Sequence, residues 1–180
     1  MQPKKPMRPI NQTLQRQITA IGYILGFMLF SITFDWVYLK LSNNSFLVFY
    51  LNQIAIISRD CIGFLAPENK VFVHNNALLS ANAYLEVDAS CSGSDFLLPM
   101  AAAMLVFKTS LKQKLFGIIF AAVLISALNL ARIVILYLIK CYQPIWFVPV
   151  HEYIAPGFNI IVCCLYFLYW ALPAKPVFTE

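Results

Sequence analysis

Charged residues are scarce in this chain of 180 residues, at 12% of the sequence, whereas hydrophobic residues make up 61% and the mean hydropathy is +0.72. A soluble domain typically has about 25% charged residues. The composition therefore excludes an ordinary soluble domain and predicts an integral membrane protein. The net charge is +5, but the basic residues stand at the ends of apolar segments rather than in one patch, so we expect no nucleic-acid partner.

The cysteines lack the spacing of a redox or metal motif. The sequence has five, with no CxxC pair and no Cys/His ligand spacing, and we expect neither a thioredoxin-like motif nor a metal site. Four of them are interpreted as small hydrophobic residues, and these are Cys61, Cys141, Cys163 and Cys164. The fifth, Cys91, has a different setting, because it stands where a polar segment meets an apolar one.

The start of the chain predicts a retained anchor rather than a cleavable leader. Residues 1–17 contain three prolines and four basic residues and are predicted to form a cytoplasmic tail. The apolar run that follows, about 18–39, is too long for the apolar core of a signal peptide and has no small-residue cleavage site. We expect a retained signal anchor and first membrane span, because about 20 residues cross the hydrocarbon core.

The next two segments are less apolar. In residues 45–66, "SFLVFYLNQIAIISRDCIGFLA", the polar side chains fall on one face of a helix, and this pattern predicts an amphipathic or membrane-embedded helix. Residues 67–90 have short β-prone runs, at 71–73, 78–79 and 84–87, between Asn-rich turns. They predict a small β-hairpin or meander outside the membrane.

Three further apolar runs, about 96–107, 115–139 and 153–172, predict three more membrane spans, and the first of them is expected to recruit flanking residues from 92 to 111. The fold class expected is thus an all-α polytopic membrane protein with about four transmembrane helices. A second cytoplasmic tail is expected at 173–180.

Lysines predict the orientation. The loop "KTSLKQK" at 108–114 and the tail with Lys175 are expected in the cytoplasm, like the basic N-terminus. Segment 45–66 then does not cross on its own, and the segment 67–90 and the 141–152 loop lie on the extracytoplasmic side. The localisation expected is the inner (plasma) membrane.

Cys91, in "EVDASCSGSDF", stands where the polar segment meets the third apolar run. The start of a helix favours an anion, which increases the thiolate fraction of a cysteine there. The neighbours Ser92 and Gly93 are small and would allow a substrate backbone to approach the sulfur. Cys91 is therefore a candidate nucleophile.

Two other reactive residues fall on the same side of the membrane. Arg132 lies inside a predicted span, where an ionisable group is costly and is a functional candidate. Asn129 lies three residues earlier, on the same helix face, where it could orient the guanidinium. His151 opens the last span. A thiol nucleophile, a cationic clamp and a proton-transfer group together predict a cysteine acyl-transfer site.

Three stretches, "ASCSGSDFL", "NLARIVIL" and "HEYIAPGFN", resemble in this order the exosortase/archaeosortase family of polytopic sorting transpeptidases. The resemblance covers roughly 85–167, and one small departure is Ser90, where the family often has alanine. Residues 18–172 would then form one exosortase-like transmembrane domain, short for the family.

The resemblance implies a Cys91–Arg132–His151 active site without a cofactor. Cys91 would cleave the C-terminal sorting signal of exported proteins, a short motif followed by a transmembrane helix and a basic tail, through a thioester. An amine or lipid-linked acceptor in the membrane would then receive the protein. Arg132 would stabilise developing charge or hold the substrate, and His151 would transfer protons.

Three other functions stay open at this stage. An intramembrane cysteine protease would let water resolve the thioester. A four-span thiol–disulfide carrier would pair Cys91 with Cys141, and a non-catalytic assembly subunit would not need Cys91. Among the remaining residues, His74 is interpreted as a solvated loop residue and Asp88 as an exposed polar group, while aromatic residues at the ends of spans, such as Trp36, Tyr38, Trp146 and Trp170, are interpreted as interfacial residues.

Overall fold

The computed structural model describes residues 9–42 and 45–172. Helix α1 (Pro9–Ser42) begins inside the segment 1–17 that was predicted to be a tail, with proline at its first position, where no hydrogen-bond donor is needed. Residues 1–8 of that segment, and the predicted tail at 173–180, lie outside the described residues.

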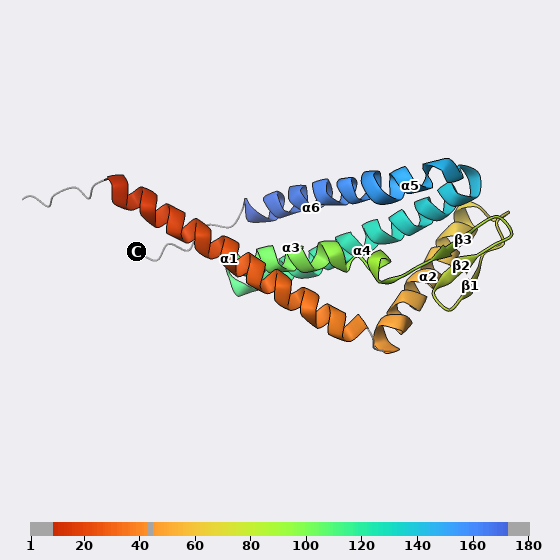
Figure 1. Cartoon of the computed structure of the whole chain (residues 1–180), viewed down its shortest axis with the longest axis horizontal. Helices are drawn as coiled ribbons and strands as arrows, with labels where there is room; N and C mark the ends of the chain where they lie inside the picture. The colour runs from red at the N-terminus through yellow and green to blue at the C-terminus, as the bar shows by residue number, and fades with distance from the viewer. Residues whose placement is uncertain (1–8, 43–44, 173–180) are drawn as a thin grey trace, which may run out of the picture.

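Helix α2 (Ser45–Leu65) follows α1 but does not return along it. It continues at an angle from the end of α1 towards a small sheet at one end of the molecule, called the sheet end below (Figure 1). A row at helical spacing faces the interior, and its members are Leu47, Leu51, Ala55, Ser58 and Ile62. The predicted helix is confirmed, and Arg59 pairs with Asp60 away from this row, but Val48, Phe49 and Phe64 are exposed as well, so the outward face is not uniformly polar.

The sheet is an antiparallel meander of three short strands, β1 (Phe72–His74), β2 (Ala77–Leu79) and β3 (Tyr84–Glu86), in the order β1-β2-β3. This confirms the three strands expected in the segment 67–90. Asn75, with a φ of 48°, makes the first turn, a backbone conformation that asparagine tolerates better than most residues. The sheet is buried against α2 and against the long helix 111–142 through three apolar side chains, Leu78, Leu85 and Val87.

Helix α3 (Ser94–Val106) leads away from the sheet end and is followed by α4 (Leu111–Tyr142), which returns to it (Figure 1). α3 is shorter than the predicted 92–111 span. The chain is extended at Phe107, and Ser110 begins α4 by accepting a hydrogen bond from the backbone N–H of Gln113. The residues expected to lengthen α3 therefore form a turn and the cap of α4.

The last helical segment begins at residue 144, earlier than the expected residue 153. Short helical turns, η2 (Pro144–Trp146) and α5 (Phe147–Pro149), precede a π-helical turn, η3 (Val150–Ile154), which runs directly into α6 (Ala155–Ala171). α6 runs beside α4, away from the sheet end (Figure 1). Lys108 and Lys112 lie in and near the α3–α4 turn, at the opposite end.

Two apolar clusters hold the helices together. One lies at the sheet end among α2, the sheet and the second half of α4, and includes Cys91 and Tyr137. The other joins α3, the first half of α4 and the end of α6 around Met104 and Trp170. Many large apolar side chains outside these clusters are exposed, especially on α1 and α6, and such a surface is typical of contact with lipid.

Four segments of the described residues are long and apolar enough to cross a membrane: Gln17–Tyr38, Leu47–Leu65, Leu111–Tyr142 and Pro144–Ala171. The protein is thus an all-α polytopic membrane protein with a small sheet, as predicted. The set of candidate spans differs in one respect, since it includes α2 and leaves out α3, which at 13 residues extends about 20 Å. That α2 does not cross stays a prediction.

Candidate active site

Cys91 is the last residue of a 3₁₀ turn, η1 (Ala89–Cys91), which connects β3 to α3. The turn is capped by Asp88, whose carboxylate accepts a hydrogen bond from the backbone N–H of Cys91 at 3.2 Å. Cys91 is buried in the cluster at the sheet end. It therefore lies just before α3 rather than in its first turn, on a segment with its own cap.

Three carbonyl groups around Cys91 are each held by a different helix. The hydroxyl of Tyr38, on α1, donates to the carbonyl of Ala89 at 3.1 Å. The amide Nδ2 of Asn129, on α4, donates to the carbonyl of Cys91, and the hydroxyl of Tyr50, on α2, donates to that of Ser92 at 3.4 Å. Hydrogen bonds from three elements fix the backbone on both sides of the sulfur more firmly than the short turn could alone.

Ser92 and Gly93 let the chain pass close to α4. Gly93 has a φ of 78°, in the left-handed region that favours glycine, and a Cβ placed on it would lie 3.4 Å from the Cβ of Asn129. Ser92 is buried, and its hydroxyl bonds those of Tyr38, at 2.9 Å, and Ser94, at 2.8 Å. The small residues therefore serve a close approach of backbone to helix as well as the turn itself.

Arg132 lies one turn after Asn129 on α4 and reaches the segment that contains His151. Its Nη2 donates to the main-chain carbonyl of His151 at 3.4 Å. Its Nε is buried and has no hydrogen-bond partner in the described part of the chain, and the same holds for Oδ1 of Asn129. One buried donor and one buried acceptor on this side of α4 are thus left without a hydrogen-bond partner among the described residues.

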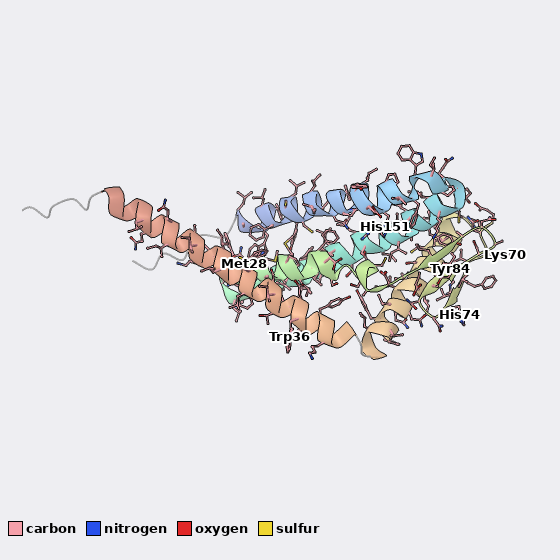
Figure 2. The ribbon with its side chains drawn as sticks, in the orientation of Figure 1. Met28, Trp36, Lys70, His74, Tyr84 and His151 are labelled. Carbon is pink, nitrogen blue, oxygen red and sulfur yellow. The ribbon has the colours of Figure 1, made fainter. Side chains whose placement is uncertain are left out.

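His151 belongs to the π-helical turn η3. π-Helical turns are rare and are frequent at functional sites. Figure 2 shows His151 at the side of the last helix that faces α4. Its ring is stacked on that of Phe147, with centroids 5.5 Å apart.

The structure brings the predicted residues together through a chain of contacts. Cys91 is bonded to Asn129 through its carbonyl, Asn129 precedes Arg132 by one turn, and Arg132 bonds the backbone of His151. Ser92 and Gly93 directly follow Cys91, and Gly93 lies against Asn129. The segments that meet, η1, the second half of α4 and η3, are far apart in the sequence.

Sequence reasoning missed four residues of this site. Tyr38 is expected only at the membrane interface, Asp88 is exposed as expected but also caps the Cys91 turn, and the sequence gives no role to Tyr50 or Phe147. Two of the four had a local signal: aspartate three residues before Cys91 matches the spacing of a cap, and Phe147 lies four residues before His151, the spacing of neighbours on one helix face. The two tyrosines reach the site from helices whose packing a single sequence does not show.

His74, the other histidine, ends β1, is exposed, and stands apart from His151 (Figure 2). The four other cysteines have free thiols; Cys61 and Cys141 pack against the cluster that contains Cys91, whereas Cys163 and Cys164 lie on α6. Within residues 9–42 and 45–172, no group of three or more His, Cys, Asp or Glu side chains could hold a metal ion.

Comparison with known proteins identifies the family. Residues 14–170 match a family model described as transmembrane exosortase (Exosortase_EpsH). The chain belongs to the transmembrane exosortase family. No curated protein and no solved structure matches the chain. For this exosortase the family implies, in general terms, a membrane cysteine peptidase or transpeptidase.

Proposed function

We propose that this exosortase is a cysteine transpeptidase that cleaves the C-terminal sorting signal of exported proteins and transfers them to an acceptor in the cell envelope. The observation that supports it best is that Asn129 and Arg132, one turn apart on α4, donate hydrogen bonds to the main-chain carbonyls of Cys91 and His151, which come from distant segments. Cys91, Arg132 and His151 are the residue types that acyl transfer requires: a nucleophile, a cation and a proton-transfer group.

In the first half of the reaction, the Cys91 thiolate attacks the carbonyl carbon of the scissile peptide bond. The C–N bond then breaks, His151 donates a proton to the leaving nitrogen, and a thioester remains on Cys91. In the second half, a nucleophile on the acceptor gives its proton to His151 and attacks the thioester. A new acyl bond forms, and the Cys91 thiolate is restored.

Arg132 and Asn129 would hold the substrate during these steps. The buried Nε of Arg132 can donate to a carbonyl oxygen that gains negative charge, and Oδ1 of Asn129 can accept from a backbone N–H. A buried polar group without a partner costs about 1–3 kcal/mol. A bound peptide would satisfy both atoms and recover that cost.

The first experiment replaces Cys91 by alanine or serine and follows processing in the producing cells. We expect unprocessed proteins with a C-terminal helix and a basic tail to accumulate in the membrane. Cys164→Ala is the matched control, because that exposed thiol lies on α6. Immunoblotting checks that each variant is inserted; normal processing by an inserted Cys91→Ala protein would exclude every cysteine-enzyme mechanism.

Hydrolysis is the second candidate activity, since water can resolve the same thioester. Mass spectrometry of the new C-terminus of a processed protein decides between the two. A mass that includes an acceptor group supports transfer, whereas a plain carboxylate supports hydrolysis. A thiol–disulfide carrier would instead lose function with Cys141→Ser and tolerate His151→Ala.

In the proposed orientation the protein spans the inner (plasma) membrane, and its sheet end lies outside the cytoplasm. It is supported by the lysines near the α3–α4 turn, at the opposite end. Ala81 and Lys112 are exposed and mark the two ends. A membrane-impermeant maleimide should label Ala81→Cys and spare Lys112→Cys in intact cells; the reverse pattern would invert the orientation.

A further inference from the structure

Tyr38 connects α1 to the turn that contains Cys91. It lies near the end of a helix whose other side chains largely face outward: the neighbouring Trp36 is 61% exposed, whereas Tyr38 packs against the cluster that includes Cys91. The hydroxyls of Thr19 and Thr33 bond to carbonyls within α1, but that of Tyr38 bonds to Ala89 and Ser92, more than 50 residues away in the sequence.

The chemistry of the partners sets the direction of these hydrogen bonds. The carbonyl of Ala89 can only accept, and a tyrosine hydroxyl has a single proton to donate. When Tyr38 donates that proton to Ala89, its oxygen accepts from the hydroxyl of Ser92, whose own oxygen accepts from Ser94. The phenol thereby joins the first residue of the Cys91 turn to the residue directly after the cysteine.

Tyr38 thus holds the turn at two points on either side of the sulfur. Asn129 and Tyr50 each hold it at one point, through the carbonyls of Cys91 and Ser92. The backbone of Ser92 also closes onto Ala89, with a hydrogen bond of 3.1 Å. Without the phenol hydroxyl, this closure and the bond from Asn129 remain, so the turn would persist but would be less closely fixed.

We propose that Tyr38 is a positioning residue for the nucleophile: its hydroxyl holds the turn so that the thiol of Cys91 is directed at the substrate beside Arg132. The inference rests on the proposed function and assigns α1 a part in it. Displacing a reacting group by about 1 Å can slow a reaction by about a hundredfold. A change that removes one oxygen atom should therefore affect the reaction much more than the fold.

The test compares Tyr38→Phe with Tyr23→Phe, a matched change on the same helix at a half-exposed position. Both are made in the otherwise natural chain and in a chain in which Cys61, Cys141, Cys163 and Cys164 are alanine. Three quantities are measured: the amount of substrate processed per inserted enzyme in cells, the midpoint of thermal unfolding in detergent, and the rate at which iodoacetamide alkylates Cys91 between pH 5 and 10.

We expect Tyr38→Phe to reduce processing by about tenfold or more, which corresponds to the loss of one good hydrogen bond in the transition state. The pH dependence of Cys91 alkylation should also change. The unfolding midpoint should stay near that of Tyr23→Phe. Unchanged processing would overturn the proposal. It would also be overturned if processing fell only in proportion to the amount of folded protein and the pH profile of Cys91 alkylation stayed the same.

Ser92→Ala provides a second route and covers the case in which Tyr38→Phe does not insert. It removes one of the two contacts of the phenol, so it should reduce processing by itself. In the double variant with Tyr38→Phe, the further loss of processing caused by Ser92→Ala should be smaller than the loss it causes alone, because the two hydroxyls act through one contact. Full activity of Ser92→Ala, or full additivity of the two changes, would count against the proposal.

The outcome is separable from that of the proposed function. If Cys91→Ala still processes its substrates, the proposed function fails whatever Tyr38 does. If Cys91→Ala is inactive while Tyr38→Phe is fully active with an unaltered alkylation profile, the function stands and only the role of Tyr38 is refuted.

Discussion

The imidazole ring of His151 is stacked on the phenyl ring of Phe147, with centroids 5.5 Å apart and ring planes within 11° of parallel. The ammonium of Lys140, on α4, lies 4.8 Å from the centroid of the same phenyl ring. Phe147 therefore links α4 to the π-helical turn and limits the rotation of His151. Arg132 fixes the backbone of that turn, and Phe147 fixes the ring.

Replacing Phe147 by leucine should reduce processing several-fold, because leucine keeps apolar volume but removes both ring contacts. Such contacts typically contribute about 0.5–1.5 kcal/mol each. The measurement is processing per inserted enzyme, compared with Phe158→Leu, which changes an exposed phenylalanine on α6.

The link to His151 can be tested in the same assay. In a His151→Ala background, Phe147→Leu should have little further effect, because a side chain that acts through His151 has nothing left to position. An equally large loss in that background would show that Phe147 supports the fold and has no particular role at His151.

Gly93→Ala should lower the free energy of unfolding by about 1–2 kcal/mol, the cost of placing an ordinary residue in the left-handed region. Processing should fall as well, since backbone strain at Gly93 would shift the adjacent turn, whose Cys91 carbonyl is held by Asn129. Thermal unfolding in detergent and the processing assay measure the two effects.

Gly63→Ala is the control for Gly93. Gly63 lies inside α2, and a Cβ there would meet nothing within 4 Å, so alanine should leave processing unchanged and stabilise the helix by up to about 1 kcal/mol. A Gly93→Ala protein as stable and active as this control would contradict the importance assigned to the left-handed backbone.

Two of the candidate catalytic residues, Cys91 and Arg132, could be predicted from the sequence because each is chemically unusual where it stands, whereas His151 is indicated mainly by the resemblance to the family. Arginine inside an apolar run is costly, and a cysteine among serine and glycine at a helix start is uncommon in a span. The residues that position them carry no such signal. A tyrosine at the end of a span, such as Tyr38, is ordinary at a membrane interface, and only tertiary packing gives it a partner.

The fold, too, has features that the sequence predicts and features that it does not. Hydropathy predicts the long helices, and short β-prone runs predict the sheet, because both signals are local. The length of α3 and the π-helical turn at Val150–Ile154 depend on single residues at helix ends, such as the cap at Ser110, and the helical period does not resolve changes of one or two residues.

The loop before the sheet is tied to the end of α4. The hydroxyl of Tyr142 donates to the carboxylate of Glu68 and accepts from Nδ2 of Asn69 at 2.8 Å. The hydrogen bond from Tyr142 holds the pKa of Glu68 below its ordinary value. A carboxyl whose pKa is lower in the folded protein adds stability at neutral pH, and this contribution is lost as the pH falls through the folded pKa.

Tyr142→Phe should therefore weaken the pH dependence of stability at acid pH. The unfolding midpoint in detergent is measured from pH 7 to pH 3 for the variant and the natural protein. Below about pH 4.3, the ordinary pKa of a glutamate, the midpoint of the variant should fall less steeply. The difference should be small, because Glu68 is exposed to solvent. Tyr153→Phe, at an exposed position outside this contact, should leave the profile unchanged; identical profiles for both variants would exclude a contribution from Glu68.

At the other end of the molecule, α4 and α6 meet at Gly117, where a Cβ would lie only 2.2 Å from Nε1 of Trp170. That indole nitrogen donates to the carbonyl of Gln113 at 3.1 Å, and the hydroxyl of Tyr166 donates to that of Gly117 at 2.8 Å. The buried Trp170 cannot move aside without losing its hydrogen bond and its contacts with Phe107 and Phe167. The two helices therefore approach as closely as they do only because residue 117 has no side chain.

Gly117→Ala should lower the free energy of unfolding by about 1–3 kcal/mol, the usual cost of overpacking a core. The site around Cys91 contacts the second half of α4, at least three turns away from Gly117, so processing per folded enzyme should change little. Gly157→Ala, on α6, is the matched control, because a Cβ there would meet nothing within 4 Å. Equal unfolding midpoints for the two variants would refute the close packing of α4 on α6, whereas a loss of processing without a loss of stability would mean that this contact controls the distant site.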